Sequence, residues 1–439
     1  MMKNNNYHKP IIVLTIFVIL MIVFSSRSNL NNIQVKNQKV HLYDHKEIER
    51  LENAINKKEF ELEKKRFAIE KLKFGIEKKK KENEYLDMTN EKEKKQSEET
   101  KQDIKELENE ISAIEKEKKV REEEIAKEKK YYRMINDIVT DKGKIDLVYS
   151  WAGIVKTMNN RNRYNYELQF SLRAAHKYLP WLNKIYILIN SDTDYPYWIN
   201  EENSGKIIVY DRCQLIDNPK HCPTFNTFAV FAGLHKIEGL SKRFILIDDD
   251  VFINQLLTPD YFFTKNDLPR VYQKHKRMQI YKNNSEFQNI KRPDYKFAKY
   301  SHLPKPMRRD FIVKFQEEYK EYAELVQSHK TRYQIVSEEF SMIYYEYFFE
   351  RGWLLAEPKR KGKFYQIPFD HEADITKEFN KVYKDLTTKN IKTFNCNDDF
   401  SKQKAIYYKQ KKVLWNFFNK LYPEAPDYEY PNPDHENFS

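Results

Sequence analysis

Three adjacent carboxylates at the end of an apolar run are the side chains of this sequence best suited to chemistry. Asp248, Asp249 and Asp250 follow an apolar run that begins at Phe244, and the chain becomes apolar again at Val251. Neighbouring negative charges repel one another unless a cation or hydrogen-bond donors stabilise them. Hard oxygen ligands suit Mg²⁺ or Mn²⁺, which usually share their coordination shell with substrate phosphates. The motif predicts a divalent-cation site, and an ordinary solvent-facing acidic turn is the alternative.

Further blocks accompany the acidic motif in a fixed order along the chain. They are KIDLVYSW (144–151), RYNYELQFSLRAAHKYLPWLNKIYIL (163–188), CPTFNTFAVFAGLHKIEGLSKRFILIDDDVFI (222–253), YSHLPKP (300–306), SHKTRYQ (328–334), FNCNDD (394–399) and LYPEAPDYEYP (421–431). In sequence and order these blocks resemble the Stealth proteins. That family includes bacterial capsule hexose-phosphate transferases and the lysosomal-enzyme N-acetylglucosamine-1-phosphotransferase.

The resemblance implies a reaction in which an acceptor hydroxyl attacks the phosphorus next to the sugar of a nucleotide-diphosphate sugar. The nucleoside monophosphate leaves, and the product is a phosphodiester. Phosphoryl transfer of this kind depends on positioning and on charge stabilisation. We therefore expect a nucleotide-sugar donor, a UDP-sugar in the first instance, a glycan or glycoprotein acceptor, and Mg²⁺ or Mn²⁺ as cofactor.

The same resemblance implies ligands for the metal-diphosphate and a clamp for a phosphate. Arg332 would bind a phosphate with its planar guanidinium. The residues expected at the metal are Asp249, Asp250, Asn397 and Asp398.

His302 is the expected general base, because an imidazole titrates near neutral pH. Asp250 is the competing base. Four residues are expected to contact substrate, namely Asp146, Arg173, Asn226 and Asp249. For two of these a structural role is the alternative: Asp146 could cap a loop, and Arg173 could pair with Glu167.

The chain departs from the family pattern at two carboxylate positions. Phe231 stands where the family commonly has Glu, and Val336 stands where an Asp is expected after Arg332. These departures leave the donor sugar and the acceptor unassigned. They also keep open a non-catalytic, membrane-tethered adaptor. A D-x-D glycosyltransferase that forms a glycosidic bond, with Asp248 and Asp250 as its motif, is the other alternative.

Short strand-like runs alternate with helical stretches around these blocks. Apolar, β-branched runs occupy 144–151, 184–190, 206–211 and 243–250, and helical patterns occupy 166–179 and 225–237. Strands that alternate with helices predict an α/β fold, a mostly parallel sheet with helices on both faces, like that of nucleotide-sugar transferases. Ligands of such sheets bind beyond the carboxyl ends of the strands, where Asp211 and the acidic motif lie.

Residues 11–26 predict a transmembrane signal-anchor. Residues 11–24 read IIVLTIFVILMIVF, with polar residues on both sides. This length lies between that of a signal-peptide core and that of a spanning helix, so a cleaved signal peptide is the alternative. We expect a cytosolic tail at 1–10, a linker at 27–45, and the rest of the chain in a Golgi-type lumen. A bacterial envelope is the alternative location.

Residues 46–133 consist mostly of Glu and Lys but contain a heptad pattern. Its seam positions are Ile48, Ile55, Leu62, Ile69, Ile76, Ile104, Ile111 and Ile125. A heptad seam with charged flanks predicts a coiled coil, here one long helix that forms a stalk and could pair two chains. A solitary solvated helix or a disordered segment is the alternative. A polar gap places Asn83, Asn90 and Ser97 at seam positions and predicts a break or a weak zone.

Composition sets the remaining limits. The net charge is +12, but Lys and Glu are interspersed without a basic stripe, so no nucleic-acid partner is expected. With 8 Gly, neither of the usual phosphate-binding glycine loops is present. Cys213 and Cys222 could form a disulfide in an oxidising lumen or remain two buried thiols. The catalytic domain is expected to span 144–439.

Overall fold

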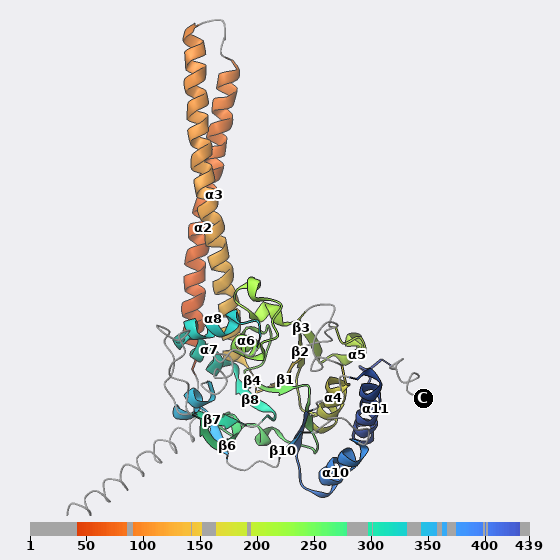
Figure 1. The fold of residues 1–439 in the computed structure, drawn as a ribbon. Helices are drawn as coiled ribbons and strands as arrows, with labels where there is room; N and C mark the ends of the chain where they lie inside the picture. The colour runs from red at the N-terminus through yellow and green to blue at the C-terminus, as the bar shows by residue number, and fades with distance from the viewer. Residues whose placement is uncertain are drawn as a thin grey trace, which may run out of the picture. The chain divides into compact units, whose positions relative to one another are not determined.

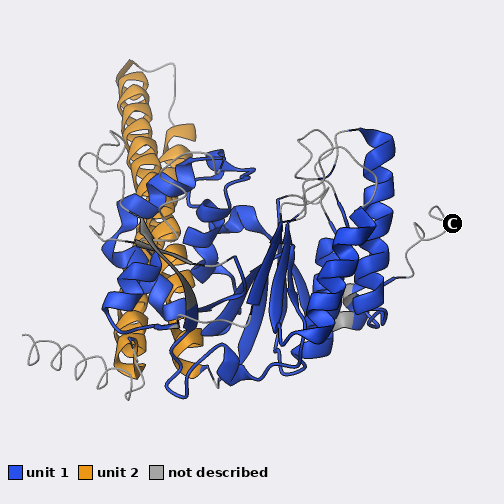
Figure 2. Ribbon diagram, turned by 60° about the horizontal axis from the view of Figure 1, so that its bottom comes forward, with its two compact units in different colours: residues 1–42, 141–439 blue, residues 43–140 orange. Residues whose placement is uncertain are grey.

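The computed structural model describes residues 42–85, 91–141, 143–151, 164–190, 195–278, 297–300, 302–331, 344–357, 362–366, 375–397, 400 and 403–430. Two compact units are present (Figure 2). One is residues 43–140, and the other comprises residues 1–42 and 141–439.

The unit 43–140 is a helical hairpin. It consists of α2 (His45–Glu84) and α3 (Glu91–Thr140) (Figure 1). Ion pairs join Lys58 to Glu128, Lys73 to Glu115 at 3.3 Å and Lys80 to Glu108 at 3.2 Å. Residues with higher sequence numbers in α2 pair with residues of lower sequence numbers in α3, so the two helices are antiparallel.

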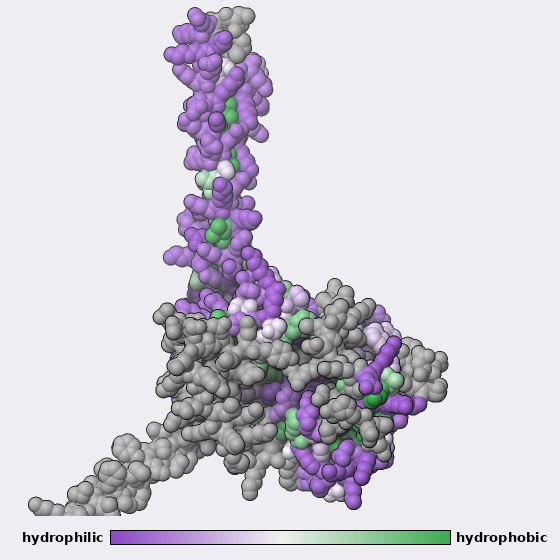
Figure 3. All heavy atoms as spheres, viewed as in Figure 1, coloured by the Kyte–Doolittle hydropathy of each residue, from purple (hydrophilic) through white to green (hydrophobic). Residues whose placement is uncertain are grey.

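The apolar seam positions that the sequence indicated are buried in the hairpin, and Met134, Ile135 and Ile138 near the end of α3 are buried as well. Ile69 and Ile76 of α2 form one apolar cluster with Ile104 and Ile111 of α3. The prediction of one long helix is wrong, because the polar gap separates two helices and the two halves of the heptad pattern pack on each other. Pairing of two chains through the stalk stays a prediction. On the face seen in Figure 3, hydrophilic residues cover most of the hairpin.

A five-stranded sheet forms the centre of the second unit. Its strands are β1 (Ile145–Ser150), β2 (Ile185–Ile189), β3 (Ile207–Asp211), β4 (Arg243–Asp248) and β8 (Lys305–Arg308), in the order β3-β2-β1-β4-β8. The first four are parallel, and β8 is antiparallel to β4. The mostly parallel sheet expected from the sequence is therefore present.

Both faces of this sheet are buried under helices, as a parallel sheet requires. Leu147 and Tyr149 point to one face and share a core with α4 (Glu167–Tyr178). Val148 points to the other face, where α6 (Thr227–Gly233), α7 (Arg309–Glu318) and α8 (Lys320–Ser328) contribute the core. This alternation explains why the strand sequences are continuously apolar.

Two three-stranded sheets and further helices complete the unit. One sheet has the order β10-β11-β5, from Gly362–Gln366, Thr393–Asn397 and Val251–Ile253. The other has the order β7-β6-β9, from Phe297–Tyr300, Arg270–Met278 and Leu355–Glu357. The unit also contains the helices α5 (Glu201–Ser204), α10 (Ile375–Thr388) and α11 (Lys404–Leu421).

Two sequence predictions concern covalent and membrane features. Cys213 and Cys222 form a disulfide with their Cα atoms 5.8 Å apart. Residues 11–26 lie outside the described residues. Within the described part of the chain, no helix has the length and apolar character needed to cross a membrane.

Candidate functional site

The acidic motif lies at the point where the strand order reverses. The chain passes from β1 to β2 and β3 on one side, and then returns to place β4 on the other side of β1. Ser150, the last residue of β1, is in register with Asp248, the last residue of β4. In open α/β sheets the ligand crevice lies at this switch point, outside the carboxyl ends of the strands. The sheet therefore places three carboxylates where a ligand is expected.

Two of these carboxylates form a cluster with the predicted base. Nε2 of His302 is 3.2 Å from Oδ2 of Asp248, and Nδ1 is 3.9 Å from Oδ1 of Asp250. One ligand atom from each of the three side chains lies within 4.8 Å of the other two. Nearly half of the His302 side chain is exposed (46%), so the imidazole can reach a bound molecule.

Two flanking strands hold this cluster in place. β8 pairs with β4 so that Lys305 is opposite Leu246, and the Lys305 ammonium is 2.9 Å from Oδ2 of Asp248. β11 pairs with β5 so that Asn395 is opposite Val251. The buried amide Nδ2 of Asn395 is 2.9 Å from Nδ1 of His302. The cluster is thus assembled from three segments that are distant in the sequence: the end of β4 with the turn after it, the start of β8 with the residues just before it, and β11.

The charges of the cluster influence one another strongly. Burial raises the pKa of the Asp250 carboxyl, the Asp248 carboxylate raises it further, and His302 opposes both effects. Oδ1 of Asp250 is buried and accepts no hydrogen bond within the described residues. A buried oxygen without a donor is energetically costly unless something else satisfies it. A cation or a protonated substrate group would supply what this oxygen lacks.

The donor set fits a divalent cation. Two carboxylates and one imidazole are ligands that Mn²⁺ accepts, and Mg²⁺ can use the same carboxylates together with substrate phosphates. The unsatisfied Oδ1 of Asp250 supports this fit. Asp248 and Asp250 are the residues that would hold the ion.

The predicted metal ligands correspond to this cluster only in part. Asp250 belongs to it, whereas Asp249 does not, although both residues lie in the turn between β4 and β5. Asn397, at the end of β11, donates from Nδ2 to Oε1 of Gln366 at 2.6 Å. Arg332 and Asp398 lie outside the described residues.

Asp146 lies at the amino-terminal end of β1, away from the cluster. Its Oδ1 accepts from Nδ2 of Asn183 at 2.7 Å and from the backbone N–H of Lys184 at 3.0 Å. Its Oδ2 accepts from the backbone N–H of Ser241 at 2.6 Å. A fully buried carboxylate with three donors holds loops together, which is the alternative that the sequence left open for Asp146.

Arg173 and Asn226, also expected to contact substrate, make contacts within the fold. Arg173 forms a buried pair with Glu429, from Nη2 to Oε2 at 2.7 Å, and donates from Nη1 to the Tyr422 carbonyl at 3.1 Å. Its partner is therefore Glu429 and not Glu167. Nδ2 of Asn226 donates to the carbonyl oxygens of Val326 and His329 at 3.2 and 2.9 Å.

Sequence reasoning missed Lys305 and Asn395. Each lies close to a residue that was singled out, Lys305 in the YSHLPKP block with His302 and Asn395 two positions before Asn397. Their closeness in sequence to predicted site residues was the available signal for Lys305 and Asn395. The pairings of β8 with β4 and of β11 with β5 bring the two side chains into contact with the cluster.

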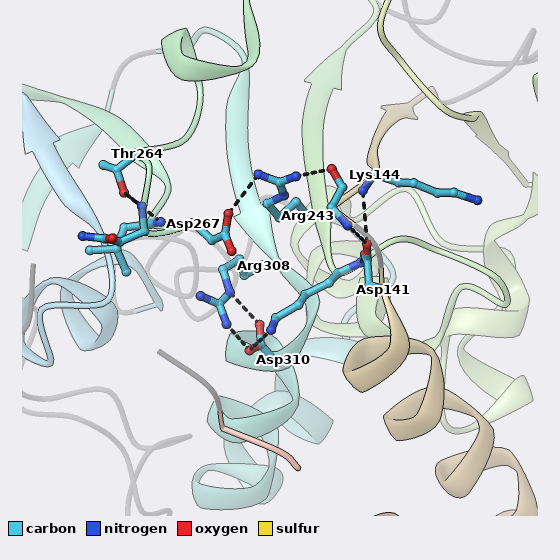
Figure 4. A network of polar contacts seen from close by, with 11 residues as sticks. Asp141, Lys144, Arg243, Thr264, Asp267, Arg308 and Asp310 are labelled. Atoms are coloured by element: carbon cyan, nitrogen blue, oxygen red, sulfur yellow. Dashed lines mark hydrogen bonds and ion pairs between the residues drawn. The ribbon is translucent and has the colours of Figure 1, made fainter. Parts of the chain in front are cut away.

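A basic cavity of about 550 Å³ lies at the opposite edge of the sheet. Its lining includes Lys144, Lys206 and Arg243. Figure 4 shows how Arg243 is held there, by Asp267 at 3.0 Å and by the carbonyl of Gly143. Arg243 and Asp248 are the two ends of β4, which a strand of this length separates by about 17 Å. This cavity is therefore separate from the acidic cluster.

Comparison with known proteins identifies the region that contains the acidic motif. A family model for Stealth protein CR2, conserved region 2, matches residues 161–271. A capsular polysaccharide phosphotransferase of Neisseria meningitidis serogroup B is 36% identical over 154 residues, which cover 35% of this chain and 38% of that protein. Subunits alpha/beta of the N-acetylglucosamine-1-phosphotransferase of Mus musculus are 36% identical over 108 residues, 25% of this chain and 8% of that protein.

Among solved structures, a glycosyltransferase involved in the glycosylation of the major capsid of PBCV-1 is similar at 10% identity and a TM-score of 0.30, over 62% of this chain and 99% of that chain. A TM-score of this size supports no conclusion about the fold. The sequence matches span well under half the length of the relatives named above. They confirm the resemblance to the Stealth proteins, whose conserved region 2 is the family model that residues 161–271 match.

Proposed function

We propose that the chain transfers a sugar 1-phosphate from a nucleotide-diphosphate sugar to a hydroxyl of a glycan acceptor. A bond forms between the acceptor oxygen and the phosphorus next to the sugar. The bond from that phosphorus to the bridging oxygen of the diphosphate breaks, and the nucleoside monophosphate leaves with the electron pair. The hydroxyl proton is transferred to a base, and the product is a phosphodiester.

One observation carries this proposal. The acidic motif lies within Stealth conserved region 2 and, at the switch point of the sheet, it contacts a histidine from a distant segment. Two of the similar proteins are named as a capsular polysaccharide phosphotransferase and an N-acetylglucosamine-1-phosphotransferase. A carboxylate pair beside an exposed imidazole provides both a site for cation-bound phosphates and a base.

The contacts of His302 define what it must do as a base. A carboxylate can only accept, so a hydrogen bond across the 3.2 Å contact with Asp248 requires the tautomer that carries its proton on Nε2. In this tautomer Nδ1 accepts from the amide of Asn395. To take a hydroxyl proton, the imidazole must release one of these contacts. The ammonium of Lys305, 2.9 Å from the same oxygen of Asp248, keeps that carboxylate paired when His302 turns away.

A divalent cation held by Asp248 and Asp250 would supply charge stabilisation to the two phosphates of the donor. The protein residues perform the remaining tasks. The Lys305 ammonium offsets the negative charge of Asp248, and Asn395 restrains the imidazole of His302 from the buried side. Arg332 remains our candidate for the phosphate clamp.

A nucleotide-sugar glycosyltransferase that forms a glycosidic bond is the second candidate. Asp248 and Asp250 belong to the cluster and Asp249 does not, which is the spacing of a D-x-D motif. Such an enzyme would release a nucleoside diphosphate, and its product would contain no phosphate.

The identity of the released nucleotide tests the proposal. The full-length chain is incubated with a panel of nucleotide-sugars, oligosaccharide acceptors and Mn²⁺ or Mg²⁺, and the released nucleotides are separated by ion-exchange chromatography. We expect a nucleoside monophosphate, a phosphodiester in the product, and loss of both in Asp250→Asn. Asp260→Asn, an exposed acidic residue after β5, is the matched control.

Each other outcome selects a different function. A nucleoside diphosphate with a phosphate-free product would identify the glycosyltransferase. If no nucleotide is released with any donor and acceptor, the non-catalytic adaptor is favoured. That hypothesis is based on the absence of carboxylates at Phe231 and Val336.

We also propose that the catalytic unit lies in the lumen of a Golgi-type compartment, anchored through residues 11–26. The disulfide between Cys213 and Cys222 supports an oxidising compartment, because such bonds are rare in the cytosol. Protease protection of the catalytic unit in sealed membranes, lost on addition of detergent, would test this placement.

A further inference from the structure

Three phenylalanines form a row on the outer side of α2. Phe60, Phe67 and Phe74 are 62%, 71% and 70% exposed. They begin three successive heptads, FELEKKR (60–66), FAIEKLK (67–73) and FGIEKKK (74–80). We call this row the Phe stripe. In an α-helix the spacing of seven places the three side chains on one face, over about 21 Å.

The hairpin does not use the Phe stripe for its own packing. Each Phe lies two positions before a buried seam residue, which is about 160° around the helix. The stripe therefore faces away from α3. The outer face of such a helix is normally polar. Three aromatic side chains with these exposures present about 400 Å² of apolar surface, a size at which surface patches mark interaction sites.

Two rows of charge flank the Phe stripe. Three positions after each Phe there is a glutamate, and four positions after each Phe there is a lysine. These residues are Glu63, Glu70 and Glu77 on one side and Lys64, Lys71 and Lys78 on the other. On a helix, offsets of three and four positions lie on opposite sides of the reference residue, about 60° and 40° away. The stripe therefore has an acidic flank and a basic flank.

We propose that the Phe stripe binds the Phe stripe of a second copy of this chain, with the two α2 helices parallel. In a parallel helix pair, opposite flanks of the two seams face each other, whereas in an antiparallel pair the same flanks meet. A parallel pair thus places each glutamate row against the lysine row of the second copy. An antiparallel pair would place glutamate against glutamate and lysine against lysine.

The flanking charges are available for this pairing. The cations that reach α3 come from other positions of α2, such as Lys58, Lys73 and Lys80. Within the described part of the chain no ion pair is formed by Glu70, Lys71 or Glu77. The pairs of the remaining flanking residues are short-range pairs along α2, such as Lys64 with Glu61 at 2.8 Å, and exposed pairs of this kind are weak enough to exchange.

Self-association of the full-length chain tests the Phe stripe. Sedimentation velocity over a range of concentrations is compared between the natural chain and the triple variant Phe60→Gln, Phe67→Gln, Phe74→Gln. Glutamine keeps the helix propensity, so circular dichroism should show unchanged helix content. We expect a dimer for the natural chain and at least about 100-fold weaker association for the variant, because buried aromatic side chains dominate interface energies.

A second triple variant serves as the matched control. Lys95→Gln, Lys116→Gln and Lys119→Gln change three exposed residues of α3, and this variant should dimerise like the natural chain. A natural chain that stays monomeric at the highest concentration would overturn the proposal. So would a Phe variant that keeps its helices and still dimerises normally.

Cross-linking tests the orientation. Phe60→Cys places a thiol at one end of the stripe, and Phe74→Cys places one at the other. Parallel pairing brings two copies of position 60 together, so Phe60→Cys alone should give a disulfide-linked dimer on mild oxidation. If instead a linked dimer forms only in a mixture of Phe60→Cys and Phe74→Cys chains, the pairing is antiparallel and the charge argument is wrong.

Discussion

At the residue scale, Asp250 is the carboxylate on which the candidate site most depends. It joins the cluster with Asp248 and His302, and its Oδ1 is buried without a hydrogen bond from the described residues. Asp250→Asn keeps the size of the side chain but removes the charge. We expect turnover to fall by at least about 100-fold, a loss typical of a key electrostatic group, with the fold intact.

Cation binding gives an independent measurement for the same variant. Titration of Mn²⁺ followed by electron paramagnetic resonance should show tight binding to the natural chain and weak binding to Asp250→Asn. Normal Mn²⁺ affinity in a folded, inactive variant would remove Asp250 from the ligands and leave it as a base.

Asn395 makes a separate prediction at this scale, because it contacts the imidazole and is itself fully buried. Asn395→Ala removes the amide that restrains His302. We expect kcat to fall by about tenfold, within the range for losing the orientation of a base, while KM for the donor stays close to normal. Stopped-flow or steady-state kinetics with a thermal melt would check it. A rise in KM with unchanged kcat would show that Asn395 acts on the donor instead.

The sequence was sufficient to find part of this cluster. Three adjacent carboxylates at a strand end are an unusual charge arrangement, and their place at the end of β4 follows from the apolar run before them. Lys305 and Asn395 could not be assigned in the same way. They contact Asp248 and His302 across 57 and 93 residues of sequence, through strand pairings that no local pattern reveals. The contact between Arg173 and Glu429 spans 256 residues, so no local pattern reveals it either. Without that partner, Arg173 was assigned to the substrate.

At the element scale, the pair of Arg173 and Glu429 joins α4 to the segment after α11. Both side chains are buried, at 6% and 1% exposure, and the contact is bidentate. Arg173→Met should cost about 3–5 kcal/mol of stability, because it leaves a buried carboxylate without its partner. Chemical denaturation monitored by circular dichroism would measure this loss.

The double variant Arg173→Met, Glu429→Met is the control for that prediction. It removes both charges and should recover much of the stability. Turnover per folded molecule should stay close to normal in each variant. A selective rise in KM for the donor would instead support the substrate contact that the sequence suggested for Arg173.

The hairpin shows what a heptad pattern can and cannot predict. The pattern indicated which residues are buried, because burial at every seam position requires only that some helix packs there. The pattern did not indicate whether the packing helix belongs to the same chain or to a second chain. A polar gap long enough to form a turn allows the two halves of the pattern to meet within one chain. That closure needs no second molecule, so it does not depend on concentration.

Packing within the hairpin gives a prediction with a close control. Ile111 lies in the shared cluster of α2 and α3 and is 8% exposed, whereas Lys119 on the same helix is exposed. Ile111→Ala should destabilise the hairpin by about 2 kcal/mol, the lower end for a core Ile in a two-helix layer. Hydrogen exchange of the α2 and α3 amides should accelerate accordingly. Lys119→Ala should leave exchange unchanged.

At the scale of the whole molecule, the two units divide their tasks. The hairpin carries its own apolar cluster, and the catalytic candidates all lie in the other unit. A chain in which a short Gly-Ser turn replaces residues 60–125 tests this division. The deletion cuts the antiparallel helices at paired positions, as the pairing of Lys58 with Glu128 shows, and it removes the Phe stripe.

We expect this shortened chain to be monomeric and to keep sugar-phosphate transfer to a soluble acceptor within about twofold, since the chemistry resides in positioned groups of the other unit. Sedimentation velocity and the nucleotide-release assay would be run on the same preparation. A monomer with normal turnover would assign the hairpin to association alone. If turnover fell while the β-sheet unit kept its thermal stability, either dimerisation or the hairpin itself would contribute to activity. The Gln variant of the Phe stripe would distinguish these two causes, because it separates the chains without shortening the helices.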